Sequence, residues 1–179
     1  IANFKVHAFT EKQSEKDHLA ITLGDIKLSD SVLTRIHSQC ITGESFFSLR
    51  CDCRFQLTES LKLIANKGCG VVFYLQQEGR GIGLSNKIRA YKLQDNGLDT
   101  VEANYHLGFD DDERNYEIVS AMASHLEIKA IDLLTNNPKK IDALKKSGLK
   151  VNKRIPIKVE SNAHNKSYLD TKAKKLGHL

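Results

Sequence analysis

The sequence predicts an α/β fold in a single domain, with a mixed, largely parallel sheet, flanking helices and a β-rich N-terminal part. Two patterns support this class. The first forty residues contain strand-like apolar segments, whereas after residue 53 helical spacings alternate with short apolar runs. The length of 179 residues favours one domain, 1–179, and no repeat, low-complexity stretch or linker divides it.

Three strands are expected in the N-terminal part, at residues 3–9, 18–23 and 31–39. Side chains of the third strand alternate between two faces, so Arg35, His37 and Gln39 share one face. This polar line ends beside Cys40. It indicates either a functional face or an edge strand whose polar side meets water.

Helices and strands are expected to alternate after Cys53. Leu57, Leu61 and Ile64 have helical spacing, and Gly68 suits the C-terminal cap of that helix. Residues 70–75 form a continuous apolar run, which is typical of a buried parallel strand. The later expected elements are helices at 84–95 and 114–126, a strand at 128–134, a helix from Asn137-Pro138 to Gly148 and a strand at 149–155.

The composition is typical of a globular protein, with 40% hydrophobic and 27% charged residues. A transmembrane helix is not expected, because no apolar run approaches the roughly 18 residues that one needs. No signal peptide is visible, so the expected location is cytoplasmic. The chain starts without Met, as expected of a trimmed chain or of part of a fusion.

A net charge of +5 and a pI near 9.0 favour anionic partners, which are nucleic acid, anionic lipid or phosphorylated small molecules. Positive residues are spread along the chain. Their densest block, Lys166 to Lys175, is expected to form a solvated helix face. Charge alone therefore does not single out nucleic acid.

All four cysteines, Cys40, Cys51, Cys53 and Cys69, lie within 30 residues. Clustered thiols in a reducing compartment more often bind metal than form disulfides, and thiolates favour zinc. Either all four close a structural site, or the first three bind zinc and leave a fourth position open to water, as catalytic sites do. Cys69 follows Gly68 at the head of an apolar strand, which favours a small buried core residue and three ligands.

Three loops between expected strands and helices carry groups suited to an anionic ligand. Gln76–Leu84 combines glycines with Glu78 and Arg80, and Lys87 follows; this is neither a Walker A nor a dinucleotide motif, but it suits a phosphate-facing loop. Asp110–Arg114 either caps a helix with acidic residues or presents its arginine to a phosphate. Thr135–Lys140 is either an ordinary capped helix start or a second anion-facing loop.

Nine segments, ordered along almost the whole chain from about Phe4, resemble GTP cyclohydrolase II. They are Arg35–Gly43, Arg50–Cys53, Gln77–Leu84, Asn86–Tyr91, Asp99–Asn104, Leu107–Phe109, Asp112–Arg114, Leu134–Lys140 and the tail Tyr168–Leu179. That family converts GTP into a 2,5-diaminopyrimidinone ribosyl phosphate, formate and pyrophosphate, the first committed step of riboflavin biosynthesis.

The resemblance implies one Zn²⁺ per chain, held by Cys40, Cys51 and Cys53, and Mg²⁺ with the GTP triphosphate. It implies that Asp112 is the general base and that Tyr91 lies close to the reacting centre. Arg114 would attack the α-phosphorus; because a guanidinium stays protonated, this residue could instead stabilise phosphate charge. A homodimer is also expected.

The resemblance also implies a set of residues that bind GTP. These are Arg35, Ile36, His37, Ser38, Gln39, Gln56, Glu78, Gly79, Arg80, Thr100, Thr135 and Lys140.

Three residues depart from the usual family pattern: Gln39 replaces Glu, Glu44 replaces Asp and Arg54 replaces Gly. The change at Gln39 keeps open a family member that releases pyrophosphate without opening the purine ring. A basic RNA-binding module with a structural four-cysteine zinc is a further alternative. Against it stand a 7% aromatic content without Trp and the scattering of the basic loop residues, so neither nucleic acid nor a membrane is an expected partner.

Overall fold

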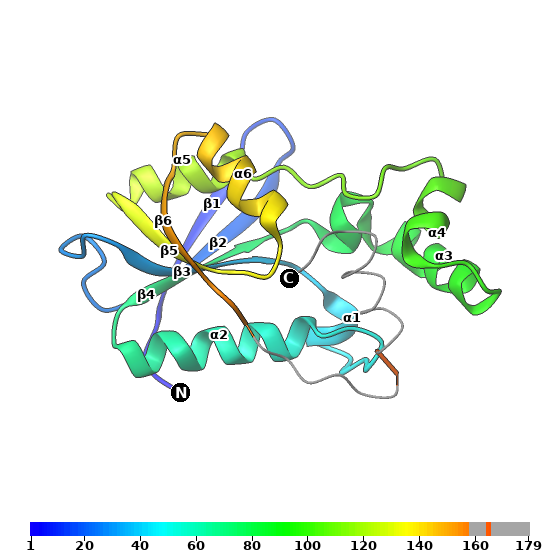
Figure 1. Cartoon of the computed structure of the whole chain (residues 1–179), viewed down its shortest axis with the longest axis horizontal. Coiled ribbons are helices and arrows are strands. Elements are labelled where there is room, and N and C mark those ends of the chain that lie inside the picture. Colours follow the sequence, from blue (N-terminus) through cyan, green and yellow to red (C-terminus); the bar gives the residue numbers. More distant parts are fainter. Residues whose placement is uncertain (158–163, 166–179) are drawn as a thin grey trace. The chain divides into compact units, whose positions relative to one another are not determined.

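The computed structural model describes residues 1–157 and 164–165 (Figure 1). Its six strands are β1 (Lys5–Glu11), β2 (Lys16–Leu23), β3 (Val32–Ser38), β4 (Gly70–Leu75), β5 (Ala130–Leu134) and β6 (Lys150–Ile155). Its helices are α1 (Ile41–Glu44), α2 (Cys53–Lys67), the 3₁₀ turn η1 (Glu78–Gly81), α3 (Gly83–Asp95), α4 (Thr100–His106), α5 (Glu117–His125) and α6 (Pro138–Lys146). The expected basic block and the tail that resembles the family lie outside the described residues.

The six strands form one mixed sheet in the order β1-β2-β4-β3-β5-β6. β1 pairs with β2, and β2 with β4, in antiparallel register, whereas β3 pairs with β5, and β5 with β6, in parallel register. The predicted mixed α/β class with flanking helices and a β-rich start is therefore confirmed. No helix within the described residues has both the length and the apolar character needed to span a bilayer.

Two expectations about individual strands are wrong. β3 is an interior strand with six of its seven residues buried, so its polar side chains do not belong to a wet edge. β4 is buried as expected, but it pairs with β2 antiparallel, since a continuous apolar run reports burial on both faces and not strand direction.

Helices cover both faces of the sheet. Figure 1 shows α2 on one side and α5 with α6 on the other. The largest fully buried side chains pack between these layers; they include Ile64, Phe73, Met122, Leu133 and Leu144. The core thus forms where the sequence places its helical stripes and its short apolar runs.

Local signals account for several helix ends. Gly68 follows α2 with a positive φ of 76°, and Asn137 caps α6 by accepting the backbone N–H of Lys139 at 3.0 Å. A missed helix, α4, starts with a capping box in which Asp99 and Glu102 exchange hydrogen bonds. Its signature, an Asp followed three residues later by a Glu, was visible in the sequence.

The helix expected at 114–126 begins later, at Glu117. The preceding acidic segment does not cap it, because its polar groups are engaged elsewhere. The backbone N–H of Glu113 donates to the carbonyl of Arg80 at 3.0 Å, and the backbone N–H of Arg114 donates to the Asp112 carboxylate at 3.2 Å. These contacts hold residues 110–114 in an irregular conformation.

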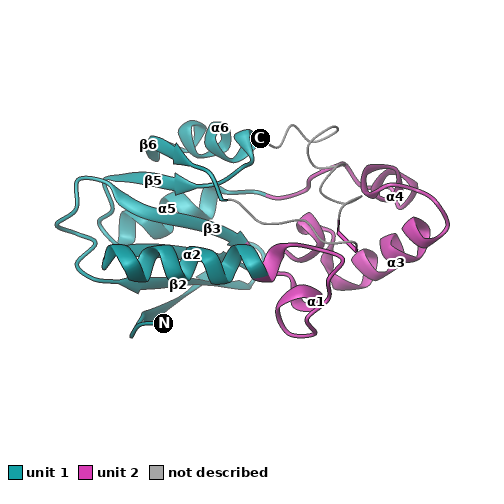
Figure 2. Ribbon diagram, turned by 60° about the horizontal axis from the view of Figure 1, so that its bottom comes forward, with its two compact units in different colours: residues 1–37, 55–76, 115–158 teal, residues 38–54, 77–114, 159–179 magenta. Residues whose placement is uncertain are grey.

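The chain divides into two compact units, which Figure 2 colours separately. Unit 1 contains residues 1–37, 55–76 and the segment that starts at residue 115, and so carries most of the sheet with α2, α5 and α6. Unit 2 contains residues 38–54 and 77–114, with α1, η1, α3 and α4. Each unit holds some of the predicted site residues.

Candidate functional site

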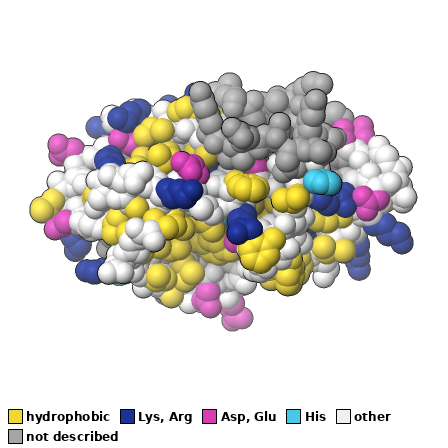
Figure 3. Space-filling model, turned by 90° about the horizontal axis from the view of Figure 1, so that it is seen from below, with side chains coloured by type: hydrophobic (Ala, Val, Ile, Leu, Met, Phe, Trp, Pro, Cys, Tyr) yellow, Lys and Arg dark blue, Asp and Glu magenta, His cyan; other side chains and the backbone are white. Residues whose placement is uncertain are grey.

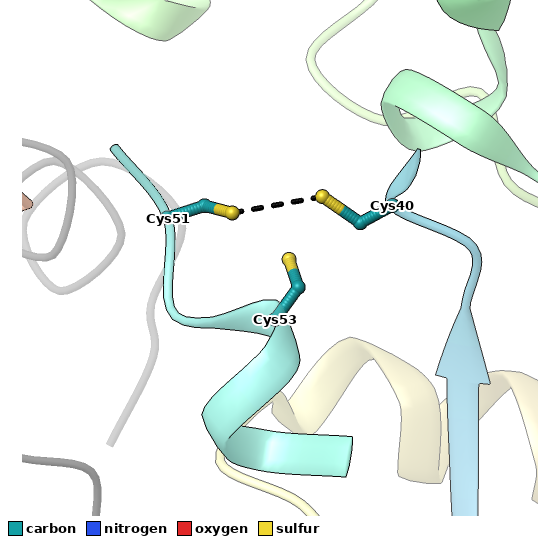
Figure 4. A group of neighbouring side chains, drawn as sticks. All are labelled: Cys40, Cys51 and Cys53. Atoms are coloured by element: carbon teal, nitrogen blue, oxygen red, sulfur yellow. Dashed lines mark hydrogen bonds between the residues drawn. The ribbon is translucent and has the colours of Figure 1, made fainter. Parts of the chain in front are cut away.

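Three cysteines of unit 2 bring their sulfur atoms together (Figure 4). Cys40 follows β3, Cys51 precedes α2 and Cys53 is the first residue of α2. Their sulfurs all lie within 4.8 Å of one another, and Cys40 Sγ is 3.6 Å from Cys51 Sγ. Cys40 and Cys51 are buried and Cys53 is partly buried. The arrangement brings three soft ligands to one point from three different backbone positions.

The backbone around the sulfurs leaves room for an ion. A Cβ atom at Gly43, in α1, would lie 2.7 Å from Cys51 Sγ and 3.3 Å from Cys40 Sγ. Glycine is therefore required where α1 passes the cluster. Three converging thiols, each able to ionise, form a donor set that suits zinc.

Cys69 is not part of this cluster. Its sulfur lies 3.4 Å from Ser29 Oγ and 3.6 Å from the carbonyl oxygen of Asp25. The side chain is half-buried against the core, so the expectation of full burial is wrong. The expectation of three cysteines at the metal site, with the fourth left out, agrees with the geometry.

The three thiols influence one another's ionisation. Hydrogen bonds from Cys51 and Cys53, with the nearby Lys87 ammonium, lower the pKa of the Cys40 thiol. The pKa of Cys51 is raised to about 11, first by its hydrogen bond to Cys40 and then by burial. Cys53 has a raised pKa for the same reasons. The cluster therefore concentrates its negative charge on Cys40.

A buried ion pair lies against Cys40. Lys87 Nζ of α3 is 3.1 Å from Cys40 Sγ and 2.7 Å from Glu78 Oε1. Glu78 also accepts the backbone N–H of Ile41, at 2.6 Å, through its other oxygen. Burial alone would lower the pKa of Lys87, but the Cys40 thiolate and the Glu78 carboxylate raise it, so the ammonium stays charged.

One face of α3 follows the segment between the ligands. Tyr91, one turn after Lys87, has its ring 4.4 Å from the Arg50 guanidinium, and Arg50 in turn pairs with Asp95 at 3.0 Å. Burial raises the pKa of Tyr91 to about 12, so its phenol remains protonated. Sequence reasoning placed Lys87 near a phosphate and missed its partner. The spacing of Lys87, Tyr91 and Asp95 at four-residue intervals was the available signal of a shared face.

Asp112 and Arg114 form the second polar centre of unit 2. Arg114 Nε lies 2.6 Å from Asp112 Oδ1, and Nη2 lies 2.5 Å from Oδ2. Nη1 lies 3.5 Å from the hydroxyl of Ser38, two residues before Cys40. Burial would raise the pKa of Asp112, but the hydrogen bonds and charge of Arg114 outweigh it and lower the pKa.

The η1 turn is built against this pair's segment. Gly79 and Arg80 both have positive φ, at 63° and 61°, which is a strained conformation for arginine. The Arg80 carbonyl accepts from Glu113, and a Cβ at Gly81 would lie 2.8 Å from Glu113 Cβ. The predicted loop therefore brings Glu78 to the cysteines and its far end to Asp112 and Arg114.

Unit 1 gathers other predicted residues at the C-terminal ends of β3 and β5. Arg35 donates to the Leu134 carbonyl at 3.0 Å and to the Gln56 side-chain oxygen. Lys140, buried in α6, donates to the Ile36 carbonyl at 2.9 Å. Parallel strands commonly form ligand sites at such ends.

The remaining predicted residues are placed as follows. In unit 1, Thr135 accepts the backbone N–H of Asn137 at 3.0 Å, and buried His37 stacks on Tyr74 at 5.7 Å. In unit 2, Gln39 is half-buried beside Cys40, and Thr100 is the first residue of α4, next to its capping residue.

Two of the residues that depart from the family pattern have defined contacts. Glu44 accepts the backbone N–H of Cys40 at 3.0 Å and so supports that ligand. Arg54 stacks its guanidinium 4.1 Å from the centre of the Phe47 ring. The added positive charge therefore has an aromatic partner next to the cysteines.

The segment that joins Cys40 to Cys51 exposes apolar side chains, Phe46, Phe47 and Leu49. The surface in Figure 3, which views the protein from the side of α2 and α1, shows hydrophobic side chains interspersed with lysine and arginine. Aromatic and cationic groups are thus neighbours here, as the Phe47–Arg54 contact illustrates.

Comparisons with known proteins agree on one family. The family model described as GTP cyclohydrolase II matches residues 1–156. The chain is 56% identical to the GTP cyclohydrolase-2 of Hahella chejuensis over 176 residues, which is 98% of this chain and 85% of that relative. It has the same identity and coverage with the protein of that name from Azotobacter vinelandii, and is 54% identical to that of Saccharophagus degradans, covering 88% of it. The chain belongs to the GTP cyclohydrolase II family.

Proposed function

We propose that the chain, acting as a single catalytic domain, is a zinc-dependent hydrolase that converts GTP into a 2,5-diaminopyrimidinone ribosyl phosphate, formate and pyrophosphate. This is the reaction that begins riboflavin biosynthesis. Family membership supports it. The observation that carries it is the pairing, within unit 2, of a three-cysteine cluster with the Asp112–Arg114 pair, which reaches Ser38 two residues before Cys40.

The cysteine cluster is proposed to serve the ring chemistry. Zinc held by three thiolates supplies a Lewis acid that activates water toward the imidazole-ring carbon of guanine. Cys40, Cys51 and Cys53 hold the ion, and Tyr91 lies beside this segment with a protonated phenol that can donate to the reacting base. Ring opening and the second hydrolysis, which releases formate, each consume one water.

The Asp112–Arg114 pair is proposed to serve the phosphate chemistry. In one version Arg114 forms a bond to the α-phosphorus, pyrophosphate leaves, and Asp112 takes the guanidinium proton; water later cleaves the phosphorus–nitrogen bond. In the other, Arg114 donates hydrogen bonds to the phosphate while water attacks. The contact of Nε and Nη2 with the carboxylate oxygens suits proton transfer and supports the first version.

The residues proposed to bind GTP come from both units. In unit 1 they are Arg35, Ile36, His37, Gln56, Thr135 and Lys140; in unit 2 they are Ser38, Gln39, Glu78, Gly79, Arg80 and Thr100. Arg35 and Lys140 bring two cations to strand ends, where a triphosphate would find charge-assisted donors.

Magnesium, a homodimer and a cytoplasmic location complete the proposal. Mg²⁺ favours phosphate oxygens and would offset the triphosphate charge. The dimer and the location follow from the resemblance. Sedimentation of the purified chain tests the dimer, and titration of Mg²⁺ at fixed GTP tests the ion.

One assay tests the reaction. The chain is incubated with GTP and Mg²⁺, and formate and pyrophosphate are measured separately. We expect the two products in equal amounts. Pyrophosphate without formate would identify a member that releases pyrophosphate without ring opening, and the absence of both would contradict the proposed function.

A further inference from the structure

Lys87 lies at the centre of a closed set of contacts around one cysteine. Its ammonium reaches both Cys40 Sγ, at 3.1 Å, and Glu78 Oε1, at 2.7 Å. The second oxygen of Glu78 accepts the N–H of Ile41, the residue after Cys40, at 2.6 Å. The lysine therefore holds the cysteine's sulfur, while the acid that it pairs with holds the cysteine's backbone.

The charges in this region give the lysine a further task. Three thiolates around one divalent ion leave one net negative charge, and Glu78 adds another. The side chains of Lys87 and Glu78 are 11% and 8% exposed, so water screens these charges poorly. Without the ammonium, Glu78 would be a buried carboxylate without its cation, next to an anionic cluster.

The rest of α3 fits the lysine for positioning. Lys87, Tyr91 and Asp95 lie four residues apart and so share one face of the helix. Lys87 contacts the first metal-ligand position, Cys40, while Tyr91 and Asp95 contact Arg50, which precedes the second, Cys51. One rigid helix thus supports both ends of the segment that carries two ligands.

We propose that Lys87 is a positioning residue of the cysteine metal site, which fixes the Cys40 sulfur and offsets the negative charge of the cluster. This deepens the proposed function and rests on its zinc site. Groups that hold a metal ligand from behind typically change metal affinity by about 10–100-fold when removed. Lys87 has this relation to Cys40.

The test compares metal binding by Lys87→Met, Lys87→Arg and Lys92→Met with that of the unaltered chain. Met keeps the length of the side chain and removes its charge, Arg keeps a cationic donor, and Lys92 is an exposed lysine of the same helix. Zinc affinity is measured by competition with a chromogenic chelator. We expect Lys87→Met to bind zinc about 10–100-fold more weakly, Lys87→Arg to recover most of the loss and Lys92→Met to match the unaltered chain.

Cobalt substitution provides a readout that a general loss of stability would not move. A thiolate that loses its cationic donor gives up electron density to the metal more readily. The sulfur-to-cobalt charge-transfer band of Lys87→Met should therefore shift to longer wavelength, while Lys87→Arg stays close to the unaltered chain. If Lys87→Met does not fold, Lys87→Gln, which retains a donor without the charge, is measured in its place with the same expectation.

Unchanged affinity and an unchanged cobalt band in the uncharged variant would overturn the role of Lys87 and leave the proposed function standing. A different result would contradict the zinc site itself. If Cys51→Ser binds zinc as tightly as the unaltered chain, the metal does not lie at the cysteines, and this inference fails with it.

Discussion

Arg114 and Asp112 meet through two parallel hydrogen bonds, from Nε and Nη2 to the two carboxylate oxygens, at 2.6 and 2.5 Å. Residues two apart in an extended segment rarely orient each other so fully. Here the segment is held by the N–H of Glu113, which donates to the Arg80 carbonyl. The pair therefore presents one guanidinium nitrogen, Nη1, away from the carboxylate and toward Ser38.

Arg114→Ala should lower pyrophosphate release by at least about 100-fold, because either proposed role removes charge stabilisation at the phosphorus. Formate should fall equally if pyrophosphate release precedes ring opening. Product assays on purified protein measure both. Arg89→Ala, which removes an exposed arginine of α3, serves as the control and should keep normal turnover. Near-normal pyrophosphate release by Arg114→Ala would contradict both roles.

Cys51→Ser should lose zinc and formate release, because the cluster loses one of its three thiolates. Slow release of pyrophosphate should persist, since Arg114 acts on the phosphate without the metal. Metal analysis and the two product assays measure these outcomes. Cys69→Ser is the matched control and should retain zinc and activity, because Cys69 lies outside the cluster. Loss of zinc from Cys69→Ser would mean that the site is a closed, structural one.

Gly81→Ala should impair activity far more than Gly97→Ala. Both glycines have strongly positive φ, at 99° and 104°, so each substitution carries a similar backbone strain of about 1 kcal/mol. A Cβ at Gly81 would in addition lie 2.8 Å from Glu113 Cβ and displace the Asp112–Arg114 segment, whereas one at Gly97 meets nothing within 4 Å. Thermal melting separates strain from misplacement. Equal loss of activity in the two variants would show that the approach of η1 to Glu113 does not matter.

Lys140→Met should lower stability by about 1.5–3 kcal/mol, since a buried ammonium that donates to the Ile36 carbonyl is lost. It should also raise the KM for GTP if the residue binds the triphosphate. Urea unfolding and steady-state kinetics measure the two effects. Lys139→Met alters the exposed neighbour and should do little to either. A stability loss without a change in KM would assign Lys140 to the structure of unit 1 alone.

Mild peroxide should lower formate release and liberate zinc in proportion, because the Cys40 and Cys51 sulfurs lie 3.6 Å apart and can pair once the metal leaves. Pyrophosphate release should fall less, since Arg114 is not a thiol. A chromogenic chelator and both product assays follow the titration, and dithiothreitol with zinc should restore the activity. Full formate release after complete thiol oxidation would exclude these cysteines as ligands of a catalytic metal.

Much of the local structure could be predicted from the sequence. Helical spacing located α2, the Asn137-Pro138 pair located the start of α6, and the C-x-C pair with Cys40 indicated three metal ligands. Such signals work because caps and amphipathic periods depend on residues a few positions apart. The same reasoning extended the helix at 114–126 too far, because the contact between Glu113 and Arg80 overrides local preference there.

Tertiary structure alone decided which distant groups meet. β3 carries Arg35 and His37 in the interior of the sheet because the strand order places it between β4 and β5, and a polar alternation does not encode that order. Lys87 contacts Cys40 across 47 residues of sequence. The sequence by itself determined that thiolates, cations and carboxylates are available at the expected loops and helix starts. Which thiolate receives the ammonium, and which carboxylate shares it, depended on the packing of α3 against the segment after β3, because ion pairs form between neighbours in space.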